Sequence, residues 1–379
     1  MNSRTCRSGI RRYDPRVPVS QMRWALAALV VGTFVLVSVP LRPADLVYTS
    51  FGDYIEALRV QVGIPGLAVA IVGPTDVLWE RGLGYQDVAR ALPMRADTPV
   101  PFDGITQVFT ASFILQCAEQ NRLSLDDQIG AYIADAPEPT ATFRQLLSHT
   151  TRSTAGLTFL YRPERLDALA SVIRRCEGAS YLSATAQQLD RLAMANSVPG
   201  ADVLSFLPPP DPREPSSESV HYAGVLDRLT KLYAVDSQKR ASVVGFAPTA
   251  QTLMPSSGLI STVHDYAQFD LALRSGILMT PETLAEAWRP ALDGTGKALP
   301  HGLGWFVQNY NGDPVIWQFG TAADNGSSSM VVTLPARGVT LVLMANSTGL
   351  VKAFPLAKGD VTTSPFAKIF LSLFTRSGL

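Results

Sequence analysis

The stretch FDGITQVFTA, residues 102–111, decides which fold this chain adopts. It leads into residues 106–121, where apolar side chains recur at intervals of three and four residues. That period is typical of a helix with one buried face. Gly104 and Gln107 are therefore predicted to lie one turn apart, at the N-terminal end of this helix.

Strand-like segments lie on both sides of this helical pattern. Residues 66–72, GLAVAIV, are rich in small and β-branched side chains, and a GPTD turn separates them from a second strand-like run at 77–84. After residue 300 come four more such runs, separated by turn residues: 302–308, 315–319, 328–334 and 339–346. We therefore predict one antiparallel-rich sheet built from both ends of the chain with helices between, an α/β (α+β) fold class.

Length and composition allow a large domain with a sizeable core. The chain has 379 residues, of which 46% are hydrophobic and 17% charged, and its formal net charge is zero. A neutral chain in which no basic run is interleaved with aromatic residues has no global field that favours nucleic acid, so we expect no nucleic-acid partner. We expect one domain over residues 46–379, with its sheet from about 50–103 and 300–379 and its helical part over about 104–290.

The N-terminal part has the pattern of a membrane anchor. Residues 24–41, WALAALVVGTFVLVSVPL, carry no charge and reach the short end of the length that crosses a bilayer. The preceding tail, residues 1–23, holds six arginines and one acid, Asp14. Positive charge of this kind keeps a tail in the cytoplasm, which places the domain outside the membrane. A cleaved signal peptide is the alternative, and it would release a secreted form of the same domain.

Several further segments carry a resemblance to a known family. They are GIPGLAVAIV (63–72), GITQVFTA (104–111), LSLDDQI (123–129), FRQLLSHTT (143–151), VIRRCEGASYL (172–182), SSGLISTVHDYAQF (256–269), HGLGWFV (301–307) and GVTLVLMANS (338–347). In order and spacing they resemble the serine β-lactamase and penicillin-binding-protein-like family, especially its class C and esterase-like branch. The resemblance implies a β-lactamase/transpeptidase-like fold, an antiparallel-rich sheet flanked by helices plus a mostly helical subdomain.

The first motif of that family is S-x-x-K at a helix N-terminus, where Lys helps to deprotonate the nucleophilic Ser. The matching positions here are Gly104 and Gln107. Glycine has no side chain with which to attack, and glutamine is neutral and cannot act as a general base. A displaced copy is also absent, because none of the six lysines follows a serine by three residues. The sequence contains no G-x-S-x-G elbow either.

The family's second motif is Y-x-N, in which Tyr assists proton transfer, and it matches Tyr161-Arg162-Pro163. Pro163 offers no amide side chain, and Tyr161 reads equally well as a core or surface tyrosine. The third motif, K-T-G or H-x-G, falls on residues 318–326, which hold neither Lys nor His. Gly320 and Thr321 match its positions, and Thr321 and Asn325 could donate hydrogen bonds to a ligand. A Gly-rich turn between strands is the alternative for this segment.

Metal and cofactor sites are not predicted. No His, Cys or Asp cluster has metal-ligand spacing, and no phosphate-cradling or dinucleotide motif is present. Cys117 and Cys176 are interpreted as small core residues, with a disulfide between them as the less favoured alternative.

The leading hypothesis is a catalytically degenerate member of the family, held on the outer face of a membrane. Its cleft would bind a peptide, a peptidoglycan fragment or an acyl compound, or the domain would bind a protein. In that case Gly104 and Gln107 lie at the base of a pocket, near Tyr161 and opposite residues 319–321. The alternative is an active serine-hydrolase-type enzyme with rewired residues, Thr106 as nucleophile and Tyr161 as base. A structural envelope protein with a closed cleft is the third.

Overall fold

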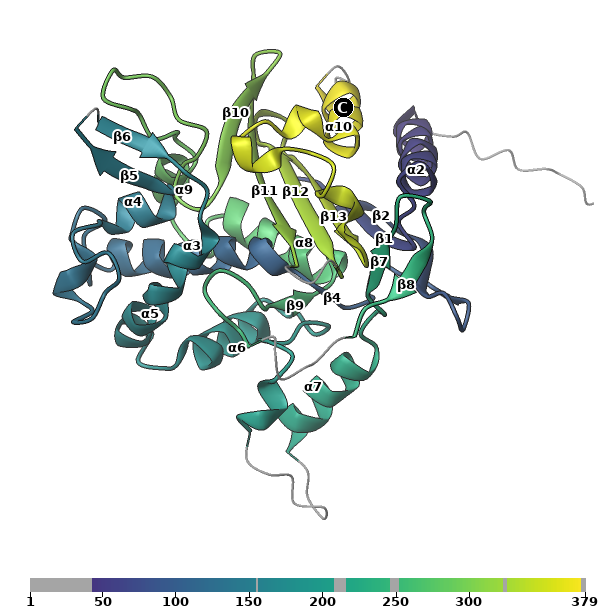
Figure 1. The fold of residues 1–379 in the computed structure, drawn as a ribbon, viewed down its shortest axis with the longest axis horizontal. Coiled ribbons are helices and arrows are strands. Elements are labelled where there is room, and N and C mark those ends of the chain that lie inside the picture. Colours follow the sequence, from purple (N-terminus) through teal and green to yellow (C-terminus); the bar gives the residue numbers. More distant parts are fainter. Residues whose placement is uncertain (1–42, 155, 208–215, 246–251, 323–325, 376–379) are drawn as a thin grey trace, which may run out of the picture. The chain divides into compact units, whose positions relative to one another are not determined.

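A computed structural model describes residues 43–154, 156–207, 216–245, 252–322 and 326–375 (Figure 1). Its main sheet is antiparallel, with seven strands in the order β10-β11-β12-β13-β1-β2-β3. The strands are β1 Gly66–Val72, β2 Val77–Asp87, β3 Leu92–Pro93, β10 Phe306–Tyr310, β11 Asp313–Thr321, β12 Ser328–Leu334 and β13 Val339–Ala345. Because β1 pairs with β13, strands from both ends of the chain are neighbours, and the predicted fold class is confirmed.

The alternation of side chains along β1 gives the sheet two different faces. Leu67, Val69 and Ile71 belong to the apolar core on one side, whereas Ala68 and Ala70 belong to the core on the other. Every residue of β1 is buried. A strand that is covered on both faces reads as a continuous apolar run, which is why GLAVAIV has no polar position.

Helices cover both faces of the sheet. The face that carries Leu67 packs against α2 (Pro43–Val62) and α10 (Pro365–Phe374). The other face packs against α3 (Thr106–Glu119) and α8 (Val263–Arg274), and α8 crosses behind the strands in Figure 1. The small side chains of Ala68 and Ala70 let α8 approach β1 closely.

The part of the chain between β4 and β10 is mostly helical, as predicted. Among the described residues it also contributes to three two-stranded pairings, β4 with β9, β5 with β6 and β7 with β8. Its elements are β4 Val100–Pro101, α4 Phe143–Leu147, β5 Thr150–Ser153, β6 Gly156–Phe159, α5 Leu169–Glu177, α6 Tyr181–Arg191, α7 Ser217–Asp227, β7 Tyr233–Val235, β8 Ala241–Val243, β9 Ile260–Ser261 and α9 Pro281–Ala287.

The interpretation of the two core cysteines needs a correction. Cys117 of α3 and Cys176 of α5 are both buried, as predicted, but they also form a disulfide, with Cα atoms 6.0 Å apart. The preference for unpaired cysteines was wrong. A separation of 59 residues along the chain says nothing about distance in space, and only the packing of α5 on α3 brings the two together.

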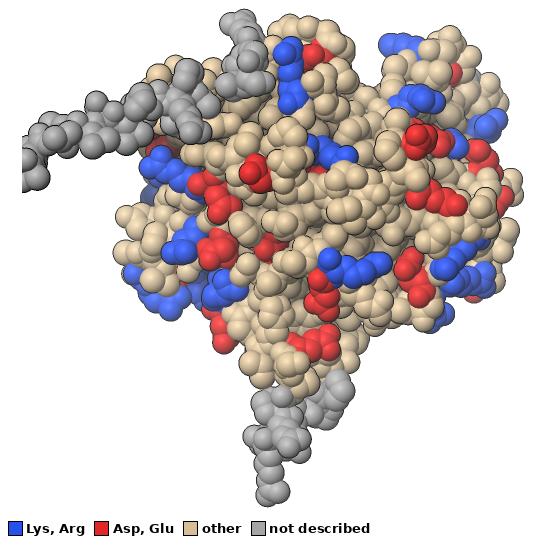
Figure 2. All heavy atoms as spheres, turned by 180° about the vertical axis from the view of Figure 1, so that it is seen from behind, with Lys and Arg blue, Asp and Glu red and all other residues tan. Residues whose placement is uncertain are grey.

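On the face shown in Figure 2, basic and acidic side chains are mixed, and neither sign gathers in a large patch. Arg144 forms surface ion pairs with Asp126 and Glu286.

No helix within the described ranges is long and apolar enough to cross a membrane. The predicted anchor at 24–41 and the arginine-rich tail at 1–23 lie outside those ranges.

Candidate functional site

The turn before α3 places Asp103 and Gly104 beside the end of β11. Residues Asp103–Ile105 form a short 3-10 helix that runs directly into α3. Phe102 anchors the turn on both sides, because its N–H donates to Leu259 O (2.7 Å) and its carbonyl accepts from Ser329 Oγ (2.7 Å). These bonds hold the start of the helix against the sheet.

Gly104 lies in direct backbone contact with β11. A Cβ atom added at Gly104 would lie 2.6 Å from Phe319 O and 3.2 Å from Gly320 Cα. A Cβ atom added at Gly320 would lie 2.3 Å from Phe102 O and 2.6 Å from Gly104 N. The two glycines therefore allow an approach that any side chain would prevent. A serine at position 104 would require β11 to move.

Gln107 is fully buried and its amide is held by three partners. Its Nε2 donates to Tyr161 Oη (2.8 Å) and to Gly104 O (3.0 Å), and its Oε1 lies 3.0 Å from His149 Nε2. His149 Nδ1 accepts from Arg162 N (3.2 Å), so the ring is neutral with its proton on Nε2. The amide is thus part of a network without charges, and an ammonium group in its place would have no carboxylate partner there.

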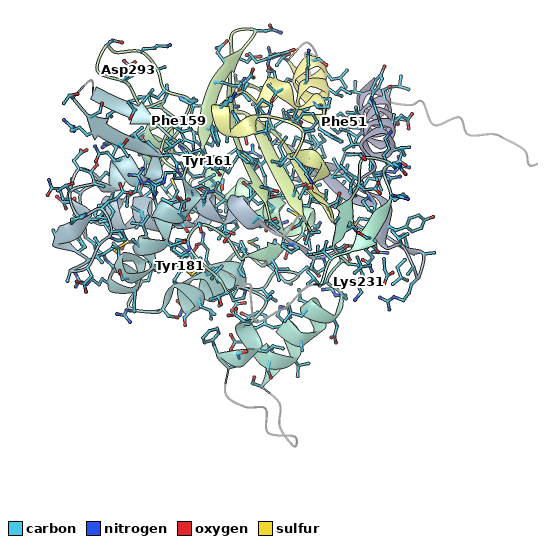
Figure 3. All side chains as sticks on the ribbon, viewed as in Figure 1. Phe51, Phe159, Tyr161, Tyr181, Lys231 and Asp293 are labelled. Carbon is cyan, nitrogen blue, oxygen red and sulfur yellow. A yellow bond between two sulfur atoms is a disulfide. The ribbon has the colours of Figure 1, made fainter. Side chains whose placement is uncertain are left out.

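Tyr161 continues this neutral network toward β11. It follows Phe159 on the segment that leaves β6 (Figure 3), and its Oη donates to Gln318 Oε1 (3.3 Å). Burial raises the pKa of the Tyr161 hydroxyl, so the phenol stays protonated. Burial also lowers the pKa of His149 well below its ordinary value and that of His301 to about 3, so both rings are neutral near pH 7.

A cavity of about 450 Å³ opens beside Gly104. The structure brings several of the family-matching positions to its wall, namely Gly104, Tyr161, Pro163, Gly320 and Thr321. Residues of the segment 252–258 and Phe319 also line this cavity.

Other predicted site residues lie elsewhere. Gln107 lies beneath Tyr161 and is not part of the cavity wall. Thr106 is also fully buried, and its Oγ1 accepts a hydrogen bond from Leu259 N (3.3 Å) rather than facing the cavity. Asn325 lies outside the described residues.

Asp103 is a cavity residue that sequence reasoning missed. Its side chain is only 7% exposed, and its Oδ2 accepts a hydrogen bond from Ser327 Oγ (2.8 Å). Burial raises the pKa of this carboxyl to about 7, and the Ser327 hydroxyl opposes the rise. The available signal was a carboxyl directly before position 104, in a stretch otherwise free of charge.

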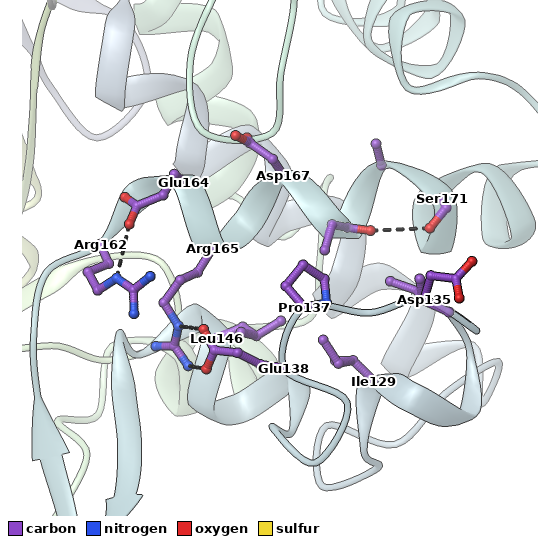
Figure 4. A pocket seen from close by; sticks show the side chains of 13 residues that line it. Ile129, Asp135, Pro137, Glu138, Leu146, Arg162, Glu164, Arg165, Asp167 and Ser171 are labelled. Carbon is purple, nitrogen blue, oxygen red and sulfur yellow. Dashed lines mark hydrogen bonds and ion pairs between the residues drawn. The ribbon is translucent and has the colours of Figure 1, made fainter.

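A second cavity, of about 500 Å³, adjoins the segment that follows Tyr161 (Figure 4). Arg165 spans its wall with two hydrogen bonds to Glu138 (2.8 Å each), and Arg162 pairs with Glu164 (3.0 Å). Glu164 lines both cavities. The carboxylate of Asp167, which lines the second cavity, accepts a hydrogen bond from the backbone N–H of Ser256. Ser256 lines the first cavity.

No group of three or more His, Cys, Asp or Glu side chains is placed to hold a metal ion within the described part of the chain.

Comparison with known proteins identifies the family and agrees with the fold. A family model described as Beta-lactamase matches residues 51–360, which is most of the chain. The chain belongs to the beta-lactamase family. The resemblance carried by its sequence segments is thereby confirmed.

Among curated relatives, the Serine beta-lactamase-like protein LACTB, mitochondrial, of Bos taurus is 29% identical over 104 residues. The aligned stretch is 26% of this chain and 19% of that protein. This chain therefore spans about a fifth of the relative's length.

Solved structures of the family share the fold over most of the chain. The octameric penicillin-binding protein homologue from Pyrococcus abyssi has a TM-score of 0.67 and 17% identity, over 86% of this chain and 77% of that one. D-alanine Carboxypeptidase AmpC from Burkholderia cenocepacia has a TM-score of 0.64 and 18% identity, over 87% and 99%. At such identities the similarity shows the fold alone.

Proposed function

We propose that this beta-lactamase-family protein binds a small ligand in the cavity beside Gly104 and forms no acyl-enzyme. The observation that carries the proposal is the contact between Gly104 and Phe319 O, because it leaves no room for a nucleophile at the family position. In a serine protease of a different fold, loss of the nucleophile costs on the order of a millionfold in turnover.

The surroundings of Gln107 support the same proposal. Its amide satisfies His149, Tyr161 and the Gly104 carbonyl at once, so the site is adapted to a neutral side chain. The cavity of about 450 Å³ favours ligand binding over the closed structural alternative. That volume suits a small molecule or a few residues of a peptide.

The name of one structural relative supports the proposed ligand class. D-alanine Carboxypeptidase AmpC from Burkholderia cenocepacia shares the fold, and its name points to ligands that contain D-alanine. We therefore propose a peptide, a peptidoglycan fragment or an acyl compound of similar size as the ligand, with a protein partner as the alternative.

An enzyme with rewired residues is the second candidate function. It requires Thr106 as nucleophile and Tyr161 as base. The fully buried position of Thr106 and the raised pKa of Tyr161 both weigh against it, since the hydroxyl cannot reach the cavity and the phenol stays protonated.

The proposed location is the outer face of a membrane, with residues 24–41 as anchor and residues 1–23 in the cytoplasm. The disulfide between Cys117 and Cys176 supports an oxidising compartment. Protease added to intact cells with a permeabilised outer layer should digest the domain. A soluble mature protein that starts near Leu46 would favour the cleaved signal peptide instead.

Two measurements test the proposed function. Intact-mass spectrometry after incubation with a fluorescent penicillin or a fluorophosphonate should show no adduct on the native protein. An adduct that prior denaturation abolishes would support the rewired enzyme.

Binding is then followed by thermal shift with a panel of small compounds that includes D-alanyl-D-alanine and its N-acetyl form. Met254→Trp should fill the cavity and abolish any stabilisation, since Met254 lines it and is 38% exposed. Leu204→Trp is the matched control, because Leu204 is 40% exposed and is not part of the cavity wall. Equal loss in both variants would contradict binding in this cavity.

A further inference from the structure

The charged side chains that line the cavity beside Gly104 are all acidic among the described residues. Asp103 and Glu164 are the charged residues among the described residues of its wall, which includes no Lys or Arg. Glu164 is exposed and pairs with Arg162 at 3.0 Å, so the rim is locally neutral (Figure 4). The Asp103 carboxylate therefore has no basic partner in the described wall of the cavity.

The Asp103 carboxyl has one protein hydrogen bond among the described residues, in which its Oδ2 accepts from Ser327 Oγ. Asp103 also lines the cavity, and its Oδ1 is not one of the fully buried atoms that lack a partner, so this oxygen is open to a ligand or to water. A carboxylate that is more than nine-tenths buried is costly without a cation or several donors. A ligand that brings a positive charge into the cavity would remove this cost.

The backbone at Asp103 is also held in an uncommon conformation. Its φ is 50°, in the left-handed region that few residues other than glycine adopt. Asp tolerates this region better than most side chains do. Strain of this kind persists where the surrounding structure imposes it, and it is concentrated at binding and active sites.

We propose that the cavity binds a small primary amine with an apolar body, whose ammonium group donates a hydrogen bond to the Asp103 carboxylate. Tyr161, Met254 and Phe319 supply the apolar contacts. This inference rests on the proposed function, since it names the ligand class of the same cavity. The neutral Gln107 fits it, because a lysine there would place a second cation close to the ligand.

The pH dependence of binding follows from the surroundings of Asp103. Burial raises the pKa of this carboxyl to about 7, and no charged side chain contributes to the shift. Ser327, directly before β12, and Ser329 of β12 approach from the sheet. Residues 252–258 contribute no ionisable side chain. Tyr161 stays protonated, and Glu164 is paired on the rim. The carboxyl therefore gains its charge as the pH rises through about 7, and amine binding strengthens with it.

The test uses three compounds that share a phenylethyl group, each added to the purified protein. Phenethylamine is a cation, 2-phenylethanol is neutral, and 3-phenylpropanoate is an anion. Isothermal titration calorimetry at pH 8 should show phenethylamine binding at least about tenfold more tightly than the other two. Its affinity should fall between pH 8 and pH 6.

Variants locate the effect at Asp103. Asp103→Asn keeps the shape and the tolerance for this φ, and should weaken phenethylamine binding about tenfold and remove its pH dependence. Ser327→Ala removes the bond that lowers the Asp103 pKa, so the midpoint of the pH profile should move upward. Asp135→Asn is the control, the same substitution in the second cavity, and should leave binding unchanged.

The outcomes separate this inference from the proposed function. Equal or tighter binding of the neutral or anionic compound, lost in Met254→Trp, overturns the amine inference and keeps the cavity as a binding site. Phenethylamine binding that Asp103→Asn does not change also overturns it. Absence of binding by all three compounds and by the wider panel contradicts both proposals.

Discussion

Asp270 on α8 and Asp103 before α3 are both buried aspartates, but their carboxyl groups have different partners. Asp270, 2% exposed, pairs with Arg274 at 2.6 Å and accepts a hydrogen bond from Thr340 Oγ1 at 3.0 Å. Within the part of the chain that the structure describes, the Asp103 carboxylate has only the hydrogen bond from Ser327 Oγ. Burial raises the pKa of both carboxyls, but only at Asp270 does a guanidinium oppose it. The comparison teaches that the structural carboxyl of Asp270 is neutralised by an ion pair. The carboxyl of Asp103 in the cavity wall has no such pair and is available to a ligand.

The largest effect should follow from breaking the paired carboxyl. Arg274→Ala leaves Asp270 buried without its cation and removes the guanidinium bonds to Gly73 O and Gly338 O. We expect a loss of about 3–5 kcal/mol in the free energy of unfolding, measured by urea denaturation at pH 7. The double variant Asp270→Asn with Arg274→Leu should recover part of it. A loss below about 1 kcal/mol in Arg274→Ala would contradict the structural role of the pair.

Removing the charge of Asp103, in contrast, should increase the free energy of unfolding. The folded-state pKa of Asp103 is raised, so ionisation opposes folding; this cost is absent below pH 4, grows as the pH rises toward about 7, and is constant above. Asp103→Asn removes it and should raise the free energy of unfolding at pH 8 by about 4 kcal/mol, with little change at pH 4. Urea denaturation at both pH values checks this. A gain that is the same at both would show that the carboxyl does not titrate as stated.

A smaller effect is expected where the cavity turn meets β11. Gly104→Ser places its Cβ against Phe319 O and should cost about 1–3 kcal/mol, measured by thermal denaturation. We expect no acylation by a fluorescent penicillin even when Gln107→Lys is added. The control is Gly224→Ala on α7, where a Cβ meets nothing within 4 Å and should be neutral or stabilising. If Gly104→Ser were as stable as the native protein, β11 could shift away from position 104 at little energetic cost.

The smallest effect should come from the exposed pair on the cavity rim. Arg162 and Glu164 are 45% and 62% exposed, so Glu164→Gln should change the free energy of unfolding by less than about 0.5 kcal/mol. Its dependence on salt concentration should be equally small. A change above about 1 kcal/mol would show that the rim is part of the structural network and weaken the contrast with Asp103.

Much of the fold could be predicted because apolar patterns are local. The run at 66–72 and the four runs after residue 300 identified most strands of the sheet, although β3 and the small pairings of the middle part were not predicted. Strands of two to four residues are too short for a period to be detected. The disulfide between Cys117 and Cys176 was not favoured, because it depends on how α5 packs against α3.

The sequence by itself determined which chemical groups the chain offers: no serine three residues before a lysine, glycine and glutamine at positions 104 and 107, and strands at both ends of the chain. Only the tertiary structure decided how close these groups lie and how far they are from water. Phe319 O over Gly104 and the burial of Asp103 depend on contacts between residues more than 200 positions apart. Desolvation and close packing are properties of such contacts, and no local pattern of residues encodes them.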